Sequence, residues 1–166
     1  MKNLLLIVTA VITICSISCV NEQVSRADDV KFRLGNEVLL ANIDKYKGNR
    51  IAVLTNQTGI LSDGTHIIDA LVGKGANVVK IFSPEHGIRG DENYTDTDEK
   101  TGIPIVSLYN GKTKPSKSDL ADVDLLIYDI QDVGARFYTY TSTLYYTIEA
   151  AAENNTSLIV CDRPMI

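Results

Sequence analysis

Hydrophobic residues fall into short continuous runs, separated by segments in which apolar positions recur at helical spacing. The continuous runs, typical of strands buried on both faces, lie at 51–54, 78–82, 103–108, 125–128 and 158–161. Helical spacing is found at 37–46, 66–74, 117–120 and 141–153. Buried strands that alternate with helices predict a Rossmann-like α/β fold, a mostly parallel sheet with helices on both faces.

The N-terminal segment carries a different pattern. Lys2 precedes an apolar stretch from Leu4 to Ile14 that is too short to span a bilayer and is typical of a signal-peptide core. The small residues that end this stretch resemble a bacterial lipoprotein cleavage box with Cys19 as the lipidated residue, although Ser16 stands where leucine is usual. An ordinary secretory signal with an incidental cysteine is the alternative.

These patterns divide the chain into three parts. We expect a lipoprotein signal peptide at 1–19, a tether at 20–35 and one Rossmann-like domain at 36–166. The protein is then expected in the cell envelope, anchored to a membrane by lipid after export, on the periplasmic or extracellular face.

Charge and cysteine content narrow the classes of function. The formal net charge is −5, and loss of residues 1–19, which contain one lysine and no acid, makes it more negative by one. Nucleic acid is therefore not an expected partner, because phosphate binding needs a basic surface. Cys15 leaves with the signal and Cys19 carries lipid, so Cys161 remains, as a buried apolar residue without a disulfide or zinc framework.

Polar residues gather directly after the predicted strands. Ligands bind to parallel sheets at the carboxyl ends of the strands, so these residues are expected to share one site. Arginine can grip a carboxylate with two hydrogen bonds, and Asn, Gln and Asp suit sugar hydroxyls, which together favour a polar, hydroxylated, anionic ligand. The candidates are Asn56, Gln57, Glu85, His86, Arg89, Gln131, Asp132, Arg136, Tyr138, Asp162 and Arg163.

Each candidate also has a structural interpretation. Gly87 and Gly90 suit a turn after a strand. Asp129 and Asp132 suit turn or capping positions, and Arg136 suits a salt bridge to Asp132.

Residues outside the candidate set have structural interpretations too. Tyr145 and Tyr146 have the spacing of helix packing and are expected in the core rather than the site. His66, at the start of a predicted helix, is expected to be structural or exposed.

Motifs of other chemistries are missing from the sequence. Neither G-x-G-x-x-G after a strand nor G-x-x-x-x-G-K-[ST] occurs, so no nucleotide cofactor is predicted. Glu85 and His86 are adjacent, and side chains of adjacent residues diverge, so no metal is predicted. The nucleophile elbow G-x-S-x-G is also missing, which counts against a hydrolase for esters or phosphates on the same fold without excluding one.

Four strings carry a family resemblance. Residues 54–59 read LTNQTG, 83–90 read SPEHGIRG, 128–140 read YDIQDVGARFYTY and 162–164 read DRP. From about Asn36 to Pro164 the chain resembles the bacterial exo-β-N-acetylmuramidases of peptidoglycan recycling, formerly a domain of unknown function. The resemblance implies a Rossmann-like N-terminal domain that bears the active-site cleft, followed by a second domain.

The resemblance also implies a reaction and a set of roles. The reaction is hydrolysis of the β-1,4 bond that releases N-acetylmuramic acid from the non-reducing end of peptidoglycan fragments. Glu85 is the first choice for the acid, with His86 as its neighbour, and Asp132, Asp162 or the substrate's own acetamido group fills the second role. Arg89, Arg136 and Arg163 are candidates for the lactyl carboxylate.

The sequence departs from the family at its end. The family usually continues its last motif as Asp-Arg-Pro-Asn-Pro, whereas Met165 and Ile166 follow Pro164. We therefore expect the chain to be truncated before the C-terminal domain. A non-catalytic or degenerate sugar-binding envelope lipoprotein is the alternative to an active enzyme.

Overall fold

Five parallel strands form one sheet in the order β3-β2-β1-β4-β5. The strands are β1 (Ile51–Thr55), β2 (Val78–Ser83), β3 (Ile105–Ser107), β4 (Leu125–Asp129) and β5 (Ser157–Val160). The computed structural model describes residues 32–90, 95–109 and 111–164, and the fold belongs to the unit that begins at Arg33. The predicted signal peptide, Cys19 and the tether up to residue 31 lie outside these residues.

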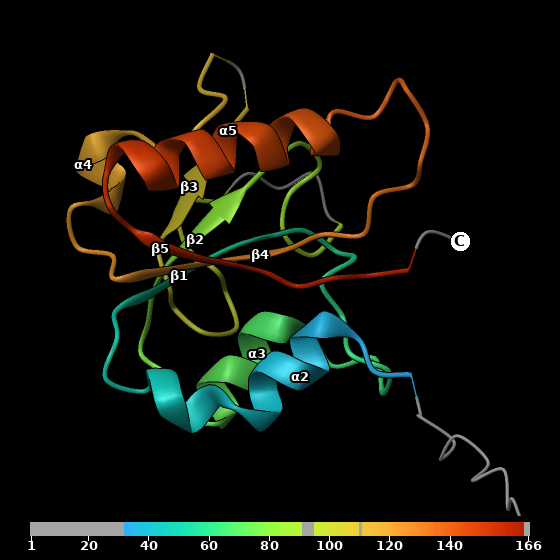
Figure 1. The fold of residues 1–166 in the computed structure, drawn as a ribbon, viewed down its shortest axis with the longest axis vertical. Coiled ribbons are helices and arrows are strands. Elements are labelled where there is room, and N and C mark those ends of the chain that lie inside the picture. The colour runs from blue at the N-terminus through green and yellow to red at the C-terminus, as the bar shows by residue number, and fades with distance from the viewer. Residues whose placement is uncertain (1–31, 91–94, 110, 165–166) are drawn as a thin grey trace, which may run out of the picture. The chain divides into compact units, whose positions relative to one another are not determined.

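Helices cover both faces of the sheet (Figure 1). One face carries α2 (Gly35–Ala41), the 3-10 helix η1 (Ile43–Tyr46) and α3 (Ile67–Gly73), and the other carries α4 (Lys117–Leu120) and α5 (Tyr140–Glu153). The predicted fold class, a Rossmann-like parallel sheet between helices, is confirmed. The helix predicted at 37–46 is divided at Asn42, whose side chain donates to the Val38 carbonyl at 2.9 Å and competes with the helical pattern.

The two faces of the sheet bury two separate cores. Alternate residues of a strand point to opposite faces, so Ile51 and Val53 of β1 pack toward α2 and α3, while Ala52 and Leu54 pack toward α4 and α5. Residues 51–55 are all fully buried, which explains why this strand reads as a continuous apolar run. Cys161 is buried as expected, and burial raises the pKa of its thiol to about 12.

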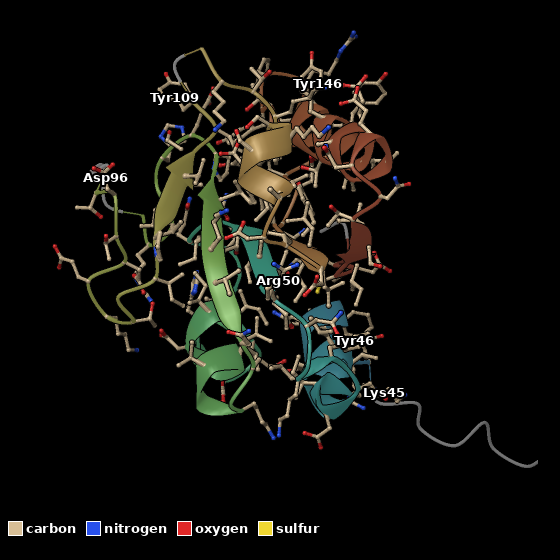
Figure 2. The ribbon with its side chains drawn as sticks, turned by 90° about the vertical axis from the view of Figure 1, so that its left-hand side faces the viewer. Lys45, Tyr46, Arg50, Asp96, Tyr109 and Tyr146 are labelled. Carbon is tan, nitrogen blue, oxygen red and sulfur yellow. The ribbon has the colours of Figure 1, made fainter. Side chains whose placement is uncertain are left out.

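Two tyrosines of α5 differ from the prediction. Tyr145 and Tyr146 were expected in the core, but Tyr145 is 63% exposed and Tyr146, on the outer side of α5 in Figure 2, is 36% exposed. Their rings pack against each other, with centroids 5.6 Å apart. The residues of α5 that face the sheet include small ones, Thr143, Thr147 and Ala150, so the helix lies close to the strands without aromatic side chains between them.

Within the described part of the chain, no helix combines the length and the hydrophobicity that crossing a bilayer requires.

Candidate active site

The direction in which strands are added to the sheet reverses between β1 and β4. From β1 the chain builds β2 and β3 on one side, and it then returns to build β4 and β5 on the other. In such sheets the carboxyl ends of the two strands at this switch point form the ligand crevice. The predicted residues Asn56 and Gln131 lie in the segments that follow these two strands.

A hydroxyl that the sequence did not single out joins the two segments. Thr58 Oγ1 donates to Asn56 Oδ1 at 2.6 Å and accepts from the backbone N–H of Gln131 at 2.8 Å. Asn56 is fully buried, and its Nδ2 has no hydrogen-bond partner among the described residues. A buried donor of this kind is costly unless it is satisfied, so Asn56 is one candidate for contact with a ligand.

A pocket of about 560 Å³ lies beside the ends of β4 and β5, and we call it the β4–β5 pocket. Its volume is within the range usual for small-molecule sites. The pocket is built by the chain before α5, by the first turns of α5, and by the end of β5 with the residues that follow it. Six of the predicted site residues are among those that line it: Gln131, Asp132, Arg136, Tyr138, Asp162 and Arg163.

Arg163 is held inside the fold. Its Nε donates to Asp129 Oδ1 at 2.7 Å and its Nη2 to Asp129 Oδ2 at 3.1 Å, and its side chain is only 6% exposed. Asp129 is fully buried and also accepts from Asn36 Nδ2 at 3.0 Å. This pair fixes the segment after β5 against β4. It also uses much of the hydrogen-bonding capacity of the Arg163 guanidinium, which was predicted to bind substrate.

Asp132 and Gln131 also make contacts within the protein. Asp132 accepts from Gly134 N–H at 2.7 Å and from Thr141 Oγ1 at 3.0 Å, so both carboxylate oxygens are engaged and no salt bridge to Arg136 forms. Gln131 Nε2 donates to the Pro164 carbonyl at 2.9 Å. These contacts shape the wall of the pocket.

Arg136 and Asp162 remain available to a ligand. Both are exposed, both line the β4–β5 pocket, and neither side chain has a hydrogen-bond or ion-pair partner among the described residues. The backbone of Asp162 is fixed, because its carbonyl accepts from Gly35 N–H at 2.9 Å. A Cβ at Gly35 would collide with the backbone of Asp162, so this close approach requires glycine.

Glu85 lies at a sharp turn after β2. His86 and Gly87 both have positive φ, 69° and 71°, and for a non-glycine residue such as His86 this conformation is uncommon. Strained positions of this kind cluster at functional sites. Among the described residues the only partner of the Glu85 carboxylate is His86, with Nε2 and Oε2 4.0 Å apart, and the Glu85 side chain is 35% exposed.

Tyr140 lies in the lining of the β4–β5 pocket, within electrostatic range of Glu85. Its side chain is buried and lines that pocket. Burial raises the pKa of the Tyr140 hydroxyl, the nearby Asn56 side chain opposes the rise, and the charge of Glu85 adds to it. Glu85 itself does not line the pocket.

Arg89 is not available in the way that the sequence suggested. Its guanidinium makes four hydrogen bonds of 2.8 to 3.2 Å, two to Asp98 and two to Asp69. The Asp98 bonds are the largest cause of a raised pKa for Arg89. Burial disfavours the charge of Asp98, but the bonds from Arg89 and Thr101 outweigh it and lower the Asp98 pKa to about 2.

Within the described residues, no cluster of three or more His, Cys, Asp or Glu side chains is arranged to hold a metal ion. Gln57, the remaining predicted residue, is exposed beside Gly90 and lines neither the β4–β5 pocket nor the smaller pocket that contains Arg89.

The fold and the site define an α/β domain with a polar pocket at the carboxyl ends of its strands β4 and β5. The family model described as exo-beta-N-acetylmuramidase NamZ, N-terminal, matches residues 51–166, and the chain belongs to this family. The resemblance carried by the four sequence strings is thereby confirmed.

Individual relatives agree with the family match. The chain is 43% identical over 141 residues to the peptidoglycan beta-N-acetylmuramidase NamZ of Bacillus subtilis (strain 168). The aligned region covers 81% of the chain and 34% of the relative. Crystal structures of two DUF1343 family proteins from Bacteroides fragilis NCTC 9343 are also similar. One has a TM-score of 0.74 and 44% identity, over 80% of this chain and 34% of its own. The other has a TM-score of 0.69 and 42% identity, over 80% and 35%. The chain therefore spans about a third of the length of these relatives.

Proposed function

We propose that the protein is a glycoside hydrolase that releases N-acetylmuramic acid from the non-reducing end of peptidoglycan fragments by cleaving a β-1,4 bond. The observation that carries the proposal is the state of Glu85. It is held next to a strained turn that follows the carboxyl end of β2, with no hydrogen bond to another described side chain. The carboxylates of Asp129 and Asp132, by contrast, accept hydrogen bonds from other groups of the protein.

Glu85 fills the role of the general acid. Cleavage of a glycosidic bond needs a proton on the leaving oxygen, and a carboxylic acid at a partly exposed position can deliver it and be reprotonated from solvent. The second role falls to Asp162, whose carboxylate is free in the β4–β5 pocket, or to the 2-acetamido group of the substrate. We assign Asp132 to the support of its loop, which it holds through Gly134 N–H and Thr141 Oγ1.

Arg136 is the residue that recognises the acidic sugar. Muramic acid differs from glucosamine by a lactyl group that bears a carboxylate, and a free guanidinium can bind a carboxylate with two hydrogen bonds. Arg89 and Arg163 already bind carboxylates of the protein. Arg136 has no such partner among the described residues, and it lines the pocket that also contains Asp162.

The activity is tested with the β-1,4-linked disaccharide of N-acetylmuramic acid and N-acetylglucosamine. The protein is incubated with this disaccharide, and the B. subtilis relative is assayed alongside as a reference. Free N-acetylmuramic acid identified by mass spectrometry supports the proposal. Binding of the disaccharide without any cleavage would favour the alternative of a sugar-binding protein without activity.

We also propose that the protein is a lipoprotein of the cell envelope, joined to a membrane through Cys19. The support is the apolar core at residues 4–14 followed by small residues and a cysteine. Expressed in a bacterium fed a labelled fatty acid, the wild-type chain is expected to take up label and sediment with membranes, and Cys19→Ala is expected to lose both. Cys15→Ala is the matched control and retains the label. Equal labelling of Cys19→Ala and the wild type would contradict the proposal that Cys19 carries the lipid anchor.

A further inference from the structure

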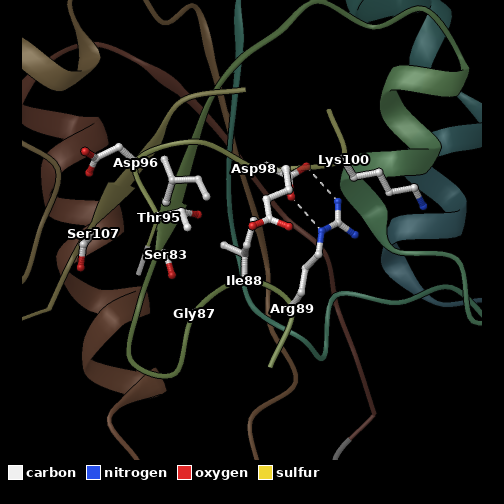
Figure 3. Close-up of a pocket in the computed structure, with 11 residues that line it drawn as sticks. Ser83, Gly87, Ile88, Arg89, Thr95, Asp96, Asp98, Lys100 and Ser107 are labelled. Atoms are coloured by element: carbon white, nitrogen blue, oxygen red, sulfur yellow. Dashed lines mark hydrogen bonds and ion pairs between the residues drawn. The ribbon is translucent and has the colours of Figure 1, made fainter. Parts of the chain in front are cut away.

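A second pocket lies beside the ends of β2 and β3, and we call it the β2–β3 pocket. It has a volume of about 210 Å³. Ser83 and residues 87–89 form one wall, and residues from the loop before β3 and from β3 itself form the others (Figure 3). Glu85 belongs to the same segment as this wall, one residue before the turn at His86 and Gly87, although its side chain lines neither pocket.

The cations of the β2–β3 pocket are already neutralised. In Figure 3 the Arg89 guanidinium is bonded to Asp98, and it also binds Asp69. Lys100 Nζ binds Asp69 as well, at 2.6 Å. Hydrogen bonds from these two cations lower the pKa of Asp69 against the opposing effect of burial, so the carboxylate stays charged. A ligand carboxylate therefore finds no free cation among the described residues that line this pocket.

The groups that remain free are acceptors and hydroxyls. Asp96 and Glu99 are exposed and have no side-chain partner within the described residues. Ser107 Oγ accepts from Tyr109 N–H at 3.3 Å and keeps its own O–H to donate. Ile88 and Ile105 add apolar surface to the lining. Carboxylates and hydroxyls that face an apolar wall suit the hydroxyls and the apolar face of an uncharged pyranose, and the two free carboxylates repel an anion.

We propose that the β2–β3 pocket holds the uncharged N-acetylglucosamine on the leaving side of the scissile bond, while the β4–β5 pocket holds the acidic sugar. This inference rests on the proposed function, because a general acid acts on the oxygen between two sugars and so has a sugar on each side. The free charges assign the two sugars. Among the described lining residues, Arg136 is the cation without a protein partner, and it lies in the β4–β5 pocket beside the carboxylate of Asp162, so that pocket takes the acidic sugar. The β2–β3 pocket has free carboxylates, Asp96 and Glu99, and no free cation, so it takes the neutral sugar.

The test maps the two monosaccharides separately by NMR on the 15N-labelled chain. N-acetylglucosamine is expected to shift amide signals at 87–89 and 105–107, and N-acetylmuramic acid to shift those at 133–138. Ser107→Ala is expected to weaken N-acetylglucosamine binding about threefold to tenfold, the loss of one hydrogen bond, and to leave N-acetylmuramic acid unaffected. Ser157→Ala is the matched control, since Ser157 is also an exposed strand serine but begins β5 at the opposite edge of the sheet, and it changes neither affinity.

A charge variant adds an independent arm. Glucuronic acid, a carboxylate-bearing pyranose, is expected to leave the signals at 105–107 unshifted in the wild type and to shift them in Asp96→Asn/Glu99→Gln.

The outcomes separate the inference from the proposed function. If N-acetylmuramic acid binds near Arg136 but N-acetylglucosamine leaves 87–89 and 105–107 unshifted, the assignment of the β2–β3 pocket is overturned and the glycosidase proposal stands. If glucuronic acid shifts residues 105–107 in the wild type, the charge argument is overturned. If neither amino sugar binds anywhere on the chain, both proposals fail.

Discussion

Two arginine environments in this domain differ in what they leave for a ligand. Arg163, with a buried carboxylate as its partner, fastens the segment after β5 to β4. Arg136, a short distance away in the same pocket lining, has no partner among the described residues. The two look alike in the sequence, since each follows a strand and lies near aspartates. The comparison shows that an arginine becomes a recognition group when the fold leaves its charge unpaired, and a structural group when the fold buries a carboxylate against it.

The largest effect is expected from the acid. Replacing Glu85 with Gln keeps the size of the side chain and removes the transferable proton, so kcat for the muramyl disaccharide is expected to fall about 10²- to 10⁴-fold. Product release is followed by chromatography, and circular dichroism confirms that the variant is folded. Asp132→Asn is the comparison variant, because that carboxylate is bonded within its loop. Full activity of the Glu85 variant would remove this residue from the mechanism.

The next effect concerns stability and sharpens the contrast between the arginines. Arg163→Ala leaves Asp129 buried without its charged partner, and such losses cost about 3 to 5 kcal/mol of the free energy of unfolding. Urea denaturation measures it.

Arg50→Ala is the matched control for Arg163→Ala. Arg50 also forms a two-pronged ion pair, with Asp124, but both side chains are exposed and water screens the pair, so the loss of stability is expected to be much smaller. Equal losses for the two variants would contradict the structural role assigned to Arg163.

Arg136→Ala is expected to act on binding and leave stability nearly unchanged. Loss of a charge-assisted contact weakens the affinity for N-acetylmuramic acid about tenfold or more, while the affinity for N-acetylglucosamine is unaffected. Calorimetric titration with both sugars measures the difference. Arg136→Lys restores the charge without the two-pronged geometry and is expected to recover part of the affinity. Unchanged affinity of Arg136→Ala for the acidic sugar would mean that a group other than Arg136 binds the lactyl carboxylate.

The smallest effect is a pH dependence that distinguishes the two histidines of the chain. His66 caps α3, with Nε2 3.0 Å from the Asn56 carbonyl, and burial lowers its pKa from 6.5 despite that hydrogen bond. The unfolded chain therefore binds a proton more readily than the folded one does. The stability due to neutral His66 is complete above pH 6.5 and is lost as the pH falls below it.

Urea denaturation between pH 7.5 and 5.5 measures this loss. The decline toward low pH is expected to be smaller in His66→Gln than in the wild type. His86→Gln, at an exposed position, is the control and is expected to keep the wild-type decline. If the decline disappears in the His86 variant instead, the loss of stability at low pH does not come from His66.

Much of the fold could be predicted from the sequence because its signals are local. The run 51–54 is apolar at every position because both faces of β1 are buried, and the helix at 117–120 begins with a serine cap. The exposure of Tyr145 and Tyr146 was not predictable, because apolar spacing does not say which side of the helix meets the sheet, and in α5 the side with Thr143, Thr147 and Ala150 does so.

The candidate site could be predicted in position but only partly in its roles. The parallel order brings the ends of all five strands to one edge, as the alternation of strands and helices indicated. The pairing of Arg163 with Asp129, 34 residues away, and of Arg89 with Asp69 and Asp98, depends on how loops fold back over the sheet. Thr58 and Tyr140 lie within the strings at 54–59 and 128–140 but were not among the candidates. Only the structure shows that the Thr58 hydroxyl joins the segments after β1 and β4 and that Tyr140 lines the β4–β5 pocket.

The most direct measurement is a crystal structure of the chain with N-acetylmuramic acid bound. Glu85 and Arg136 are expected to hold one and the same molecule, with its carboxylate on the Arg136 guanidinium and its anomeric oxygen within hydrogen-bonding reach, about 3 Å, of the Glu85 carboxyl group. A sugar bound elsewhere, or bound to Arg136 with its anomeric oxygen pointing away from Glu85, would contradict the account.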